Sequence, residues 1–112
     1  MNIQIFGKSK SFDTKKAERW FKERGVNYQA VDLLRYGLSR GEFDSVLRAV
    51  GYDAMLDPKA KGASALQYLA YDEDRLEKLF EDPGLLAAPI VRNGRQATVG
   101  YCPEVWEAWM KG

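Results

Sequence analysis

The sequence predicts an α/β fold in which a βαβ unit and a ββα unit share one four-stranded mixed sheet. Residues 2–33 have the pattern of strand, helix and strand, and residues 89–112 that of a hairpin followed by a helix. Between them, residues of about 39–81 show helical periodicity. A chain of 112 residues is long enough for one core. We therefore expect a single domain, residues 1–112, with a helical insert between strands two and three.

The first unit begins with a strand over residues 2–6, where apolar and polar side chains alternate. A helix is expected over residues 13–24, and Gly25 ends it as a C-cap. β-branched and aromatic residues over 26–33 indicate a second strand. Because one helix joins the two strands, we expect them to be parallel.

The helical insert contains the clearest helix signal in the chain. Ser39 and Glu42 have the spacing of a capping box, and apolar residues then recur at i, i+3, i+4 and i+7 until Gly51. A turn is expected over residues 57–62, followed by a weak helix and then by a further helix over 72–81.

The last unit is predicted to be a hairpin and a helix. Strands over residues 89–92 and 95–99 flank Asn93-Gly94, which suits a type I′ turn because that turn needs positive φ at both central residues. A final helix starts at Pro103, and its expected buried residues are Val105, Trp106 and either Trp109 or Met110. This order of elements is that of the thioredoxin fold with enlarged helices between strands two and three.

Composition and charge argue against several classes of function. The 17 basic and 16 acidic residues are mixed along the chain, without the basic block of a dedicated nucleic-acid binder. No signal peptide and no apolar run of about 20 residues is visible, so we expect no membrane contact. A single cysteine fits a reducing compartment, which predicts a cytoplasmic protein. The absence of histidine argues against a zinc site.

Three motifs occur in a particular order along the chain: "KKAERWF" followed by "GV", then "PGLLAAPIV", then "VGY" at the start of the last helix. In this order, and over nearly the whole chain, the sequence resembles the arsenate reductase (ArsC)/Spx family. The resemblance implies a thioredoxin-like fold with a helical insertion. It also implies a cis peptide bond before Pro89, a minority form that is usually kept for a structural purpose.

The resemblance further implies where reactive thiols would lie. The nucleophilic cysteine of the family's enzymes falls on Ser11, and the second cysteine of Spx-like Cys-x-x-Cys regulators falls on Thr14. With no histidine in the chain to deprotonate it, Ser11 would stay neutral near pH 7 and be a poor nucleophile. We therefore expect a redox-inactive, catalytically degenerate member of the family.

The family's anion-binding arginines are also replaced. Two of them fall on Ala88 and Tyr101, and for the third only Lys59 or Lys61 stands nearby. Lysine lacks the bidentate fork of arginine. The loss of the nucleophile together with at least two arginines argues against arsenate reduction.

Two interpretations of the loop before the first helix remain open. In one, Ser11 or Asp13 is simply the helix N-cap. In the other, the free N–H groups of the helix bind an anion, with Lys8, Lys10 and Lys61 assisting Ser11.

Cys102 also has two interpretations. Because the strand over 95–99 should run antiparallel to the Pro89 strand, Cys102 is expected at the end of the sheet that carries Ser11. There the dipole of the first helix would lower the thiol pKa and support a glutathione-linked or arsenate reductase-like oxidoreductase. Alternatively, Cys102 packs as a small apolar residue.

The insert also carries a group of aromatic and apolar residues that would form either a protein-contact surface or part of the core: Tyr36, Tyr52, Met55, Leu56, Tyr68 and Tyr71.

The leading functional hypothesis is a monomeric protein-binding regulator without a cofactor. The resemblance implies a partner of the Spx type, the C-terminal domain of the RNA polymerase α subunit. The alternatives are a thiol oxidoreductase that uses Cys102, with glutathione as its co-substrate, and a structural or assembly protein.

Overall fold

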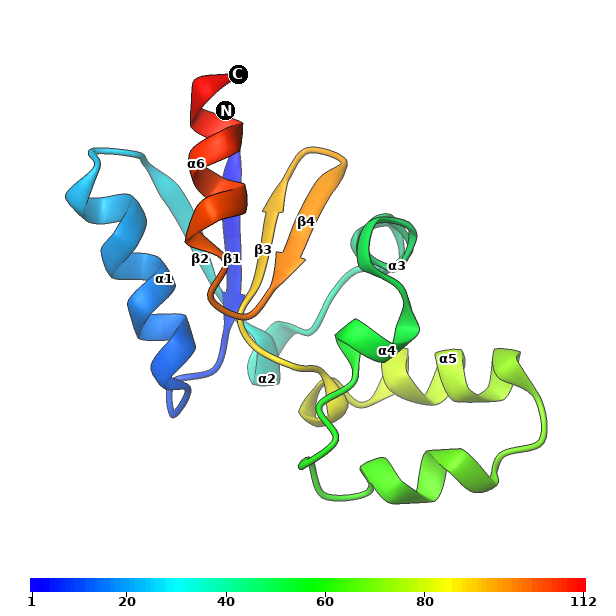
Figure 1. Cartoon of the computed structure of the whole chain (residues 1–112). Helices are drawn as coiled ribbons and strands as arrows, with labels where there is room; N and C mark the ends of the chain where they lie inside the picture. The colour runs from blue at the N-terminus through cyan, green and yellow to red at the C-terminus, as the bar shows by residue number, and fades with distance from the viewer.

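A four-stranded mixed sheet forms the centre of the computed structural model, which describes all residues from Met1 to Gly112 (Figure 1). The strand order is β2-β1-β3-β4. β1 pairs with β2 in parallel and with β3 antiparallel, and β3 pairs antiparallel with β4. The expected α/β class with a mixed sheet is confirmed. The strands are β1 (Ile3–Gly7), β2 (Tyr28–Asp32), β3 (Ile90–Asn93) and β4 (Gln96–Val99).

Six α-helices and two 3-10 helices connect the strands, and the expected helices in residues 13–24, 40–50 and 72–81 are all present. Leu33, expected to end the second strand, instead begins a short helix because the Asp32 carboxylate accepts the N–H of Leu34 at 3.1 Å. The weak helix expected after the turn over 57–62 is a 3-10 helix. The helices are α1 (Phe12–Glu23), α2 (Leu33–Tyr36), α3 (Arg40–Val50), α4 (Tyr52–Met55), η1 (Ala63–Tyr68), α5 (Asp72–Glu81), η2 (Pro83–Leu85) and α6 (Pro103–Lys111).

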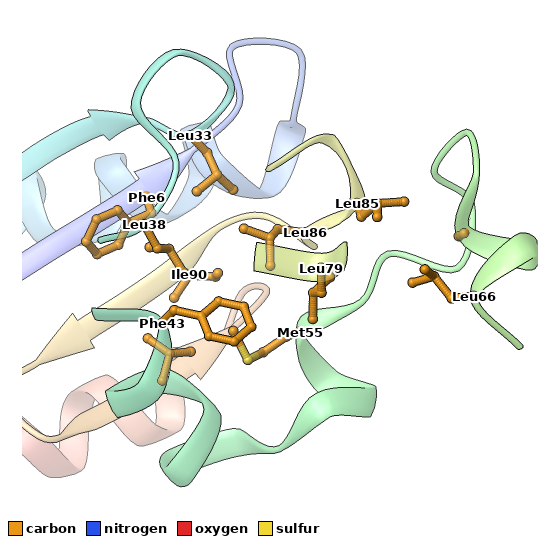
Figure 2. Close-up of a cluster of buried hydrophobic side chains, with 12 residues drawn as sticks. Phe6, Leu33, Leu38, Phe43, Met55, Leu66, Leu79, Leu85, Leu86 and Ile90 are labelled. Atoms are coloured by element: carbon orange, nitrogen blue, oxygen red, sulfur yellow. The ribbon is translucent and has the colours of Figure 1, made fainter. Parts of the chain in front are cut away.

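Two hydrophobic clusters lie on opposite faces of the sheet because successive side chains of a strand point to opposite sides. On one face, Ile5 and its neighbours pack against α1 and α6. On the other face, Phe6 and Ile90 pack against residues from α2 through η2, and Figure 2 shows this cluster continuing to Leu66 in the helical insert. The residues of the first cluster are Ile3, Ile5, Ala17, Trp20, Phe21, Val91 and Trp106.

The capping box predicted for the insert is confirmed. The N–H of Glu42 donates to Ser39 Oγ at 3.1 Å, and the N–H of Ser39 donates to the Glu42 carboxylate at 2.8 Å. These two bonds satisfy donors that the first turn of α3 would otherwise leave free.

The prediction of a type I′ turn at Asn93-Gly94 is wrong. Asn93 pairs with Gln96 as part of the sheet, so the central residues of the turn are Gly94 and Arg95. Gly94 has a φ of 61°, and no residue other than glycine has positive φ. Positive φ at the first central position alone is the pattern of a type II′ turn, in which glycine takes that position.

Helix α6 buries fewer of its residues than the sequence predicts. Trp106 is fully buried and Trp109 is partly buried, whereas Val105 and Met110 are 42% and 40% exposed. Trp106 and Trp109 are three residues apart and share the face toward the sheet, while Val105 lies beside that face. In the insert, Met55 is fully buried, so it does not contribute to an exposed surface with Tyr36, Tyr68 and Tyr71.

No helix of the structure has both the length and the apolar character needed to cross a bilayer.

The indole N–H of Trp106 is buried and needs a hydrogen-bond acceptor. It donates from Nε1 to Thr98 Oγ1 at 2.8 Å, and Thr98 is also buried. Thr98→Val keeps the shape but leaves the indole N–H without an acceptor, so we expect a loss of about 1–3 kcal/mol in the free energy of unfolding. Urea unfolding followed by tryptophan fluorescence measures it. Thr98→Ser, which keeps the hydroxyl, should lose less; equal losses in both variants would contradict this role of the bond.

Candidate functional site

The loop between β1 and α1 is closed by hydrogen bonds that use the hydroxyls of Ser11 and Thr14, the two positions where the resemblance implies thiols. The N–H of Thr14 donates to Ser11 Oγ at 3.1 Å, and the N–H of Lys8 donates to Thr14 Oγ1 at 3.3 Å. The N–H of Ser11 donates to the Lys8 carbonyl at 3.0 Å. Ser11, and not Asp13, is therefore the N-cap of α1. Both hydroxyls have a structural task in holding the loop.

Gly7 is the position that lets α1 approach the end of β1. A Cβ at residue 7 would overlap Thr14 Cγ2, closer than atoms of two side chains can come. Thr14 is itself buried. The contact between this strand end and the first turn of α1 therefore requires a residue without a side chain.

The four residues of the predicted anion site, Lys8, Lys10, Ser11 and Lys61, do not gather at one point in the structure. The Lys8 ammonium donates to the carbonyl of Gly84 at 3.2 Å and so ties the loop to η2. Lys10 is exposed in the loop, and Lys61 is exposed in the turn before η1; neither has an ion-pair partner. Lys8 and Ser11 lie in one loop, and no hydrogen bond or ion pair joins the Lys61 side chain to it. Anion binding here stays a prediction.

The cis-proline segment lies at the same end of the sheet. The Ala88–Pro89 peptide bond is cis, as the family resemblance implies. The N–H of Gly100 donates to the Pro89 carbonyl at 2.8 Å, so β4 ends beside the start of β3. The chain then enters α6, and α1 and α6 both begin at this end of the sheet (Figure 1).

Tyr101, at a position where the resemblance implies arginine, links α1 to α6. Its ring meets Trp106 edge-on, with 5.5 Å between centroids, and the ammonium of Lys16 lies 4.3 Å from the centre of the Tyr101 ring. Lys16 is a site residue that the sequence did not reveal. Lys16 and Tyr101 are far apart in the sequence, and no local pattern around an exposed helical lysine indicates that its ammonium will lie over a distant aromatic ring.

Cys102 is partly buried at the start of α6, and its Sγ–H donates to the Val99 carbonyl at 3.4 Å. Burial raises the thiol pKa above its usual value, and the carboxylates of Glu104 and Asp13 raise it further, while a hydrogen bond with Thr98 offsets part of the change. The expectation that the dipole of α1 lowers the pKa of Cys102 is therefore wrong. Desolvation of the thiolate is the largest cause of the raised pKa.

An open groove of about 420 Å³ runs between α1 and the edge strand β2. Its lining mixes two lysines with two carboxylates and contains neither thiol nor imidazole; the charged residues are Lys8, Lys15, Glu18 and Asp32. No group of three or more acidic or cysteine side chains gathers anywhere in the chain to hold a metal ion. Cys102 is the one thiol at this end of the sheet.

The close approach at Gly7 makes a testable stability prediction. Gly7→Ala forces a methyl group against Thr14 Cγ2, and overpacking of this kind costs about 1–3 kcal/mol in the free energy of unfolding. Adding Thr14→Ser removes the clashing methyl group while keeping the hydroxyl that accepts from Lys8. We expect the double variant to recover part of the loss in urea unfolding. Additive losses would show that the contact is not the cause.

No protein-family model matches the chain. Among curated proteins, it is 36% identical to the global transcriptional regulator Spx 2 of Oceanobacillus iheyensis over 107 residues, which cover 90% of this chain and 78% of that protein. It is 32% identical to the global transcriptional regulator Spx of Listeria innocua over 95 residues, covering 78% and 70% of the two chains.

Among solved structures, the arsenate reductase from Vibrio cholerae superposes with a TM-score of 0.80 at 22% identity, covering 94% of each chain. This likeness confirms the thioredoxin-like fold and, at that identity, the fold alone. The sequence likeness to the Spx proteins extends over most of both chains. On these grounds, the chain belongs to the ArsC/Spx family.

Proposed function

We propose that this chain is a regulatory member of its family that acts by binding a protein partner and performs no thiol chemistry. One observation carries the proposal: the side chain at the nucleophile position, Ser11, accepts the N–H of Thr14 at 3.1 Å as the N-cap of α1. Its oxygen serves the fold, and the chain has no histidine to take its proton.

The other family positions support the same proposal. Thr14 replaces the second thiol and accepts the N–H of Lys8. Ala88 and Tyr101 stand where the resemblance implies arginines, and the Tyr101 ring is engaged by Lys16. A site without a thiolate and without its guanidinium forks has lost both the attacking group and the groups that hold an oxyanion substrate.

The names of the relatives direct the proposal toward regulation. Proteins 36% and 32% identical to this chain are called global transcriptional regulators. We therefore propose a cytoplasmic, monomeric binding module without a cofactor. Its partner is the C-terminal domain of the RNA polymerase α subunit, as the family resemblance implies.

Phe12 marks the part of the surface that we assign to this contact. It is the first residue of α1, directly after Ser11, and its side chain is 83% exposed. Exposed aromatic side chains are costly to leave in water and are enriched in the centres of protein interfaces. With Lys10 exposed two residues before it, the loop offers an aromatic anchor beside a positive charge.

Isothermal titration calorimetry tests the proposal by measuring how the purified chain binds the purified C-terminal domain of the α subunit. Phe12→Ala should weaken binding about tenfold or more, as loss of an aromatic anchor does. The matched control is Tyr68→Ala, because Tyr68 is 81% exposed on η1 and should change affinity little.

Absence of binding by the unmodified chain would reject this partner. Equal weakening in the two variants would reject the assigned surface but leave the partner standing.

The alternative is a thiol oxidoreductase based on Cys102. Its favourable feature is position, because Cys102 begins α6 at the end of the sheet where α1 begins, and Asp13 at the start of α1 influences its pKa. Its unfavourable feature is chemistry, because the raised pKa keeps the group a thiol near neutral pH, and the thiolate is the nucleophile. We rank it second for that reason.

The pH dependence of Cys102 alkylation by iodoacetamide separates the two functions. Because the folded-state pKa is raised, the native thiol should react more slowly at pH 7 than the same thiol in denaturant, and its rate should rise at a higher pH. Glu104→Gln removes a carboxylate that raises the pKa, so its rate profile should move to lower pH.

A native thiol that reacts faster than the unfolded one near pH 7, together with arsenate or glutathione-linked turnover lost in Cys102→Ala, would support the enzyme. If neither partner binding nor turnover is found, the structural or assembly hypothesis is the one that remains.

A further inference from the structure

Strand β2 forms an open edge of the sheet. Its one neighbour in the strand order is β1, and the element that otherwise packs most closely on it is α2, which directly follows it in the chain (Figure 1). At the opposite edge of the sheet, α3 packs against β4. The surface assigned above to the contact at Phe12 does not include β2.

The main chain of β2 has hydrogen-bonding groups that the fold does not use. Each residue from Tyr28 to Asp32 is paired with one residue of β1, without a bulge. Outside this ladder, no backbone–backbone hydrogen bond reaches residues 28–31. Because an edge strand turns part of its N–H and C=O groups away from its single neighbour, the outward groups of β2 are left without a main-chain partner.

β2 also lacks the features that usually protect an edge strand from pairing with another chain. Such strands are often very short or bulged, or they carry lysine or proline. β2 is as long as β1, and its sequence, YQAVD, contains neither residue. Gln29 and Ala30, in its middle, are exposed. An open edge of this kind is a template for another strand, and addition of an extended peptide to such an edge is a recurring mode of recognition.

Two hollows follow one another along this edge, between β2 and α1. The first, of about 420 Å³, is the groove described above and includes Ala30. The second, of about 260 Å³, lies at the start of β2 and includes Tyr28. Side chains two residues apart in a strand point to the same face, about 7 Å from each other. An added strand has the same repeat, so its side chains on the α1 face can enter both hollows.

The charges beside the hollows favour an acidic peptide. Lys15 lines the first hollow and Lys22 the second; both are exposed, and neither forms an ion pair within the protein. The Lys8 ammonium and the Asp32 carboxylate, which also line the first hollow, are each engaged in a hydrogen bond within the protein. Glu18 lies one helical turn from each exposed lysine and can offset one of the two charges. The remaining charge along the edge is positive.

We propose that β2 binds an extended acidic segment of a partner protein as an additional strand of the sheet. The main chain of the segment bonds to the outward N–H and C=O groups of β2. Acidic side chains on its α1 face enter the two hollows and reach Lys15 and Lys22. This contact shares no residue with the surface at Phe12, so its presence does not depend on the proposed function.

Titration of the protein with the end-blocked peptide Glu-Val-Glu-Val-Glu, followed by two-dimensional ¹H–¹⁵N NMR at constant ionic strength, tests the site. The glutamates of this peptide share one face when it is extended. We expect saturable shifts centred on the amides of residues 28–32. The peptide Lys-Val-Lys-Val-Lys should bind at least about threefold more weakly, because it replaces attraction to the two lysines by repulsion. Equal binding of the two peptides would overturn the acidic preference.

Two N-methylated forms of the acidic peptide separate strand addition from simple attraction of charge. One form carries methyl groups on the glutamate nitrogens and the other on the valine nitrogens. Because successive N–H groups of a strand point to opposite sides, only one form loses the donors that face β2. That form should lose binding while the other keeps it. Equal effects of the two patterns of methylation would overturn strand addition.

Variants of the protein locate the contact. Lys15→Ala and Lys22→Ala should each weaken binding about threefold, as expected for loss of an exposed ion pair. Ala30→Glu places a carboxylate in the first hollow and should weaken binding further. Arg19→Ala removes the same charge from an exposed position of α1 that lines neither hollow, so as the matched control it should leave affinity unchanged. The spectrum of each variant without peptide shows whether it is folded.

Absence of saturable binding, shifts centred away from residues 28–32, or equal weakening in Arg19→Ala and Lys15→Ala would overturn the proposal. Shifts of the same amides when the protein is concentrated without peptide would identify a second copy of this chain as the occupant, and would equally overturn the acidic partner.

Discussion

Strand β1 is hydrogen-bonded along both edges, to β2 and to β3, and its apolar side chains are buried on both faces of the sheet. Ile3 and Ile5 anchor α1 and α6, while Phe6 anchors the elements on the opposite face. The helices on both faces of the sheet therefore pack against the same five-residue strand, β1. The strand ends at Gly7, and the contact with Thr14 there sets where α1 begins and how the loop of the candidate site is shaped.

This arrangement explains how the loop keeps its form with hydroxyls at the two positions where the resemblance implies thiols. The loop needs a side-chain acceptor for the N–H of Thr14, and Ser11 supplies one. Thr14 in turn holds the N–H of Lys8, and the Lys8 side chain reaches Gly84 beyond the helical insert. Hydroxyls satisfy these needs without being nucleophiles at neutral pH. Cys102 lies at the same end, but its burial favours the neutral thiol, so position alone does not make it reactive.

The surface around Phe12 lies at the end of the sheet where α1 begins. Around Phe12, an exposed aromatic ring and nearby lysines suit a protein partner.

Much of the fold follows from signals within a few residues of one another. The capping box of Ser39 and Glu42, the strand alternation in β1 and the proline that opens α6 are local, and each predicts its element correctly. The order of elements and the family motifs likewise place Ser11, Thr14 and Pro89 at one end of the sheet before any coordinates are considered.

The remaining features depend on residues far apart in the chain, and only the tertiary structure decided them. Pairing of Asn93 with Gln96 moves the hairpin turn, and packing against the sheet selects Trp106 over Val105. The ring of Tyr101 meets Lys16 only because folding brings the segment before α6 to the side of α1. The raised pKa of Cys102 arises in the same way. Desolvation is set by whichever neighbours folding brings into contact, and local sequence patterns do not contain that information.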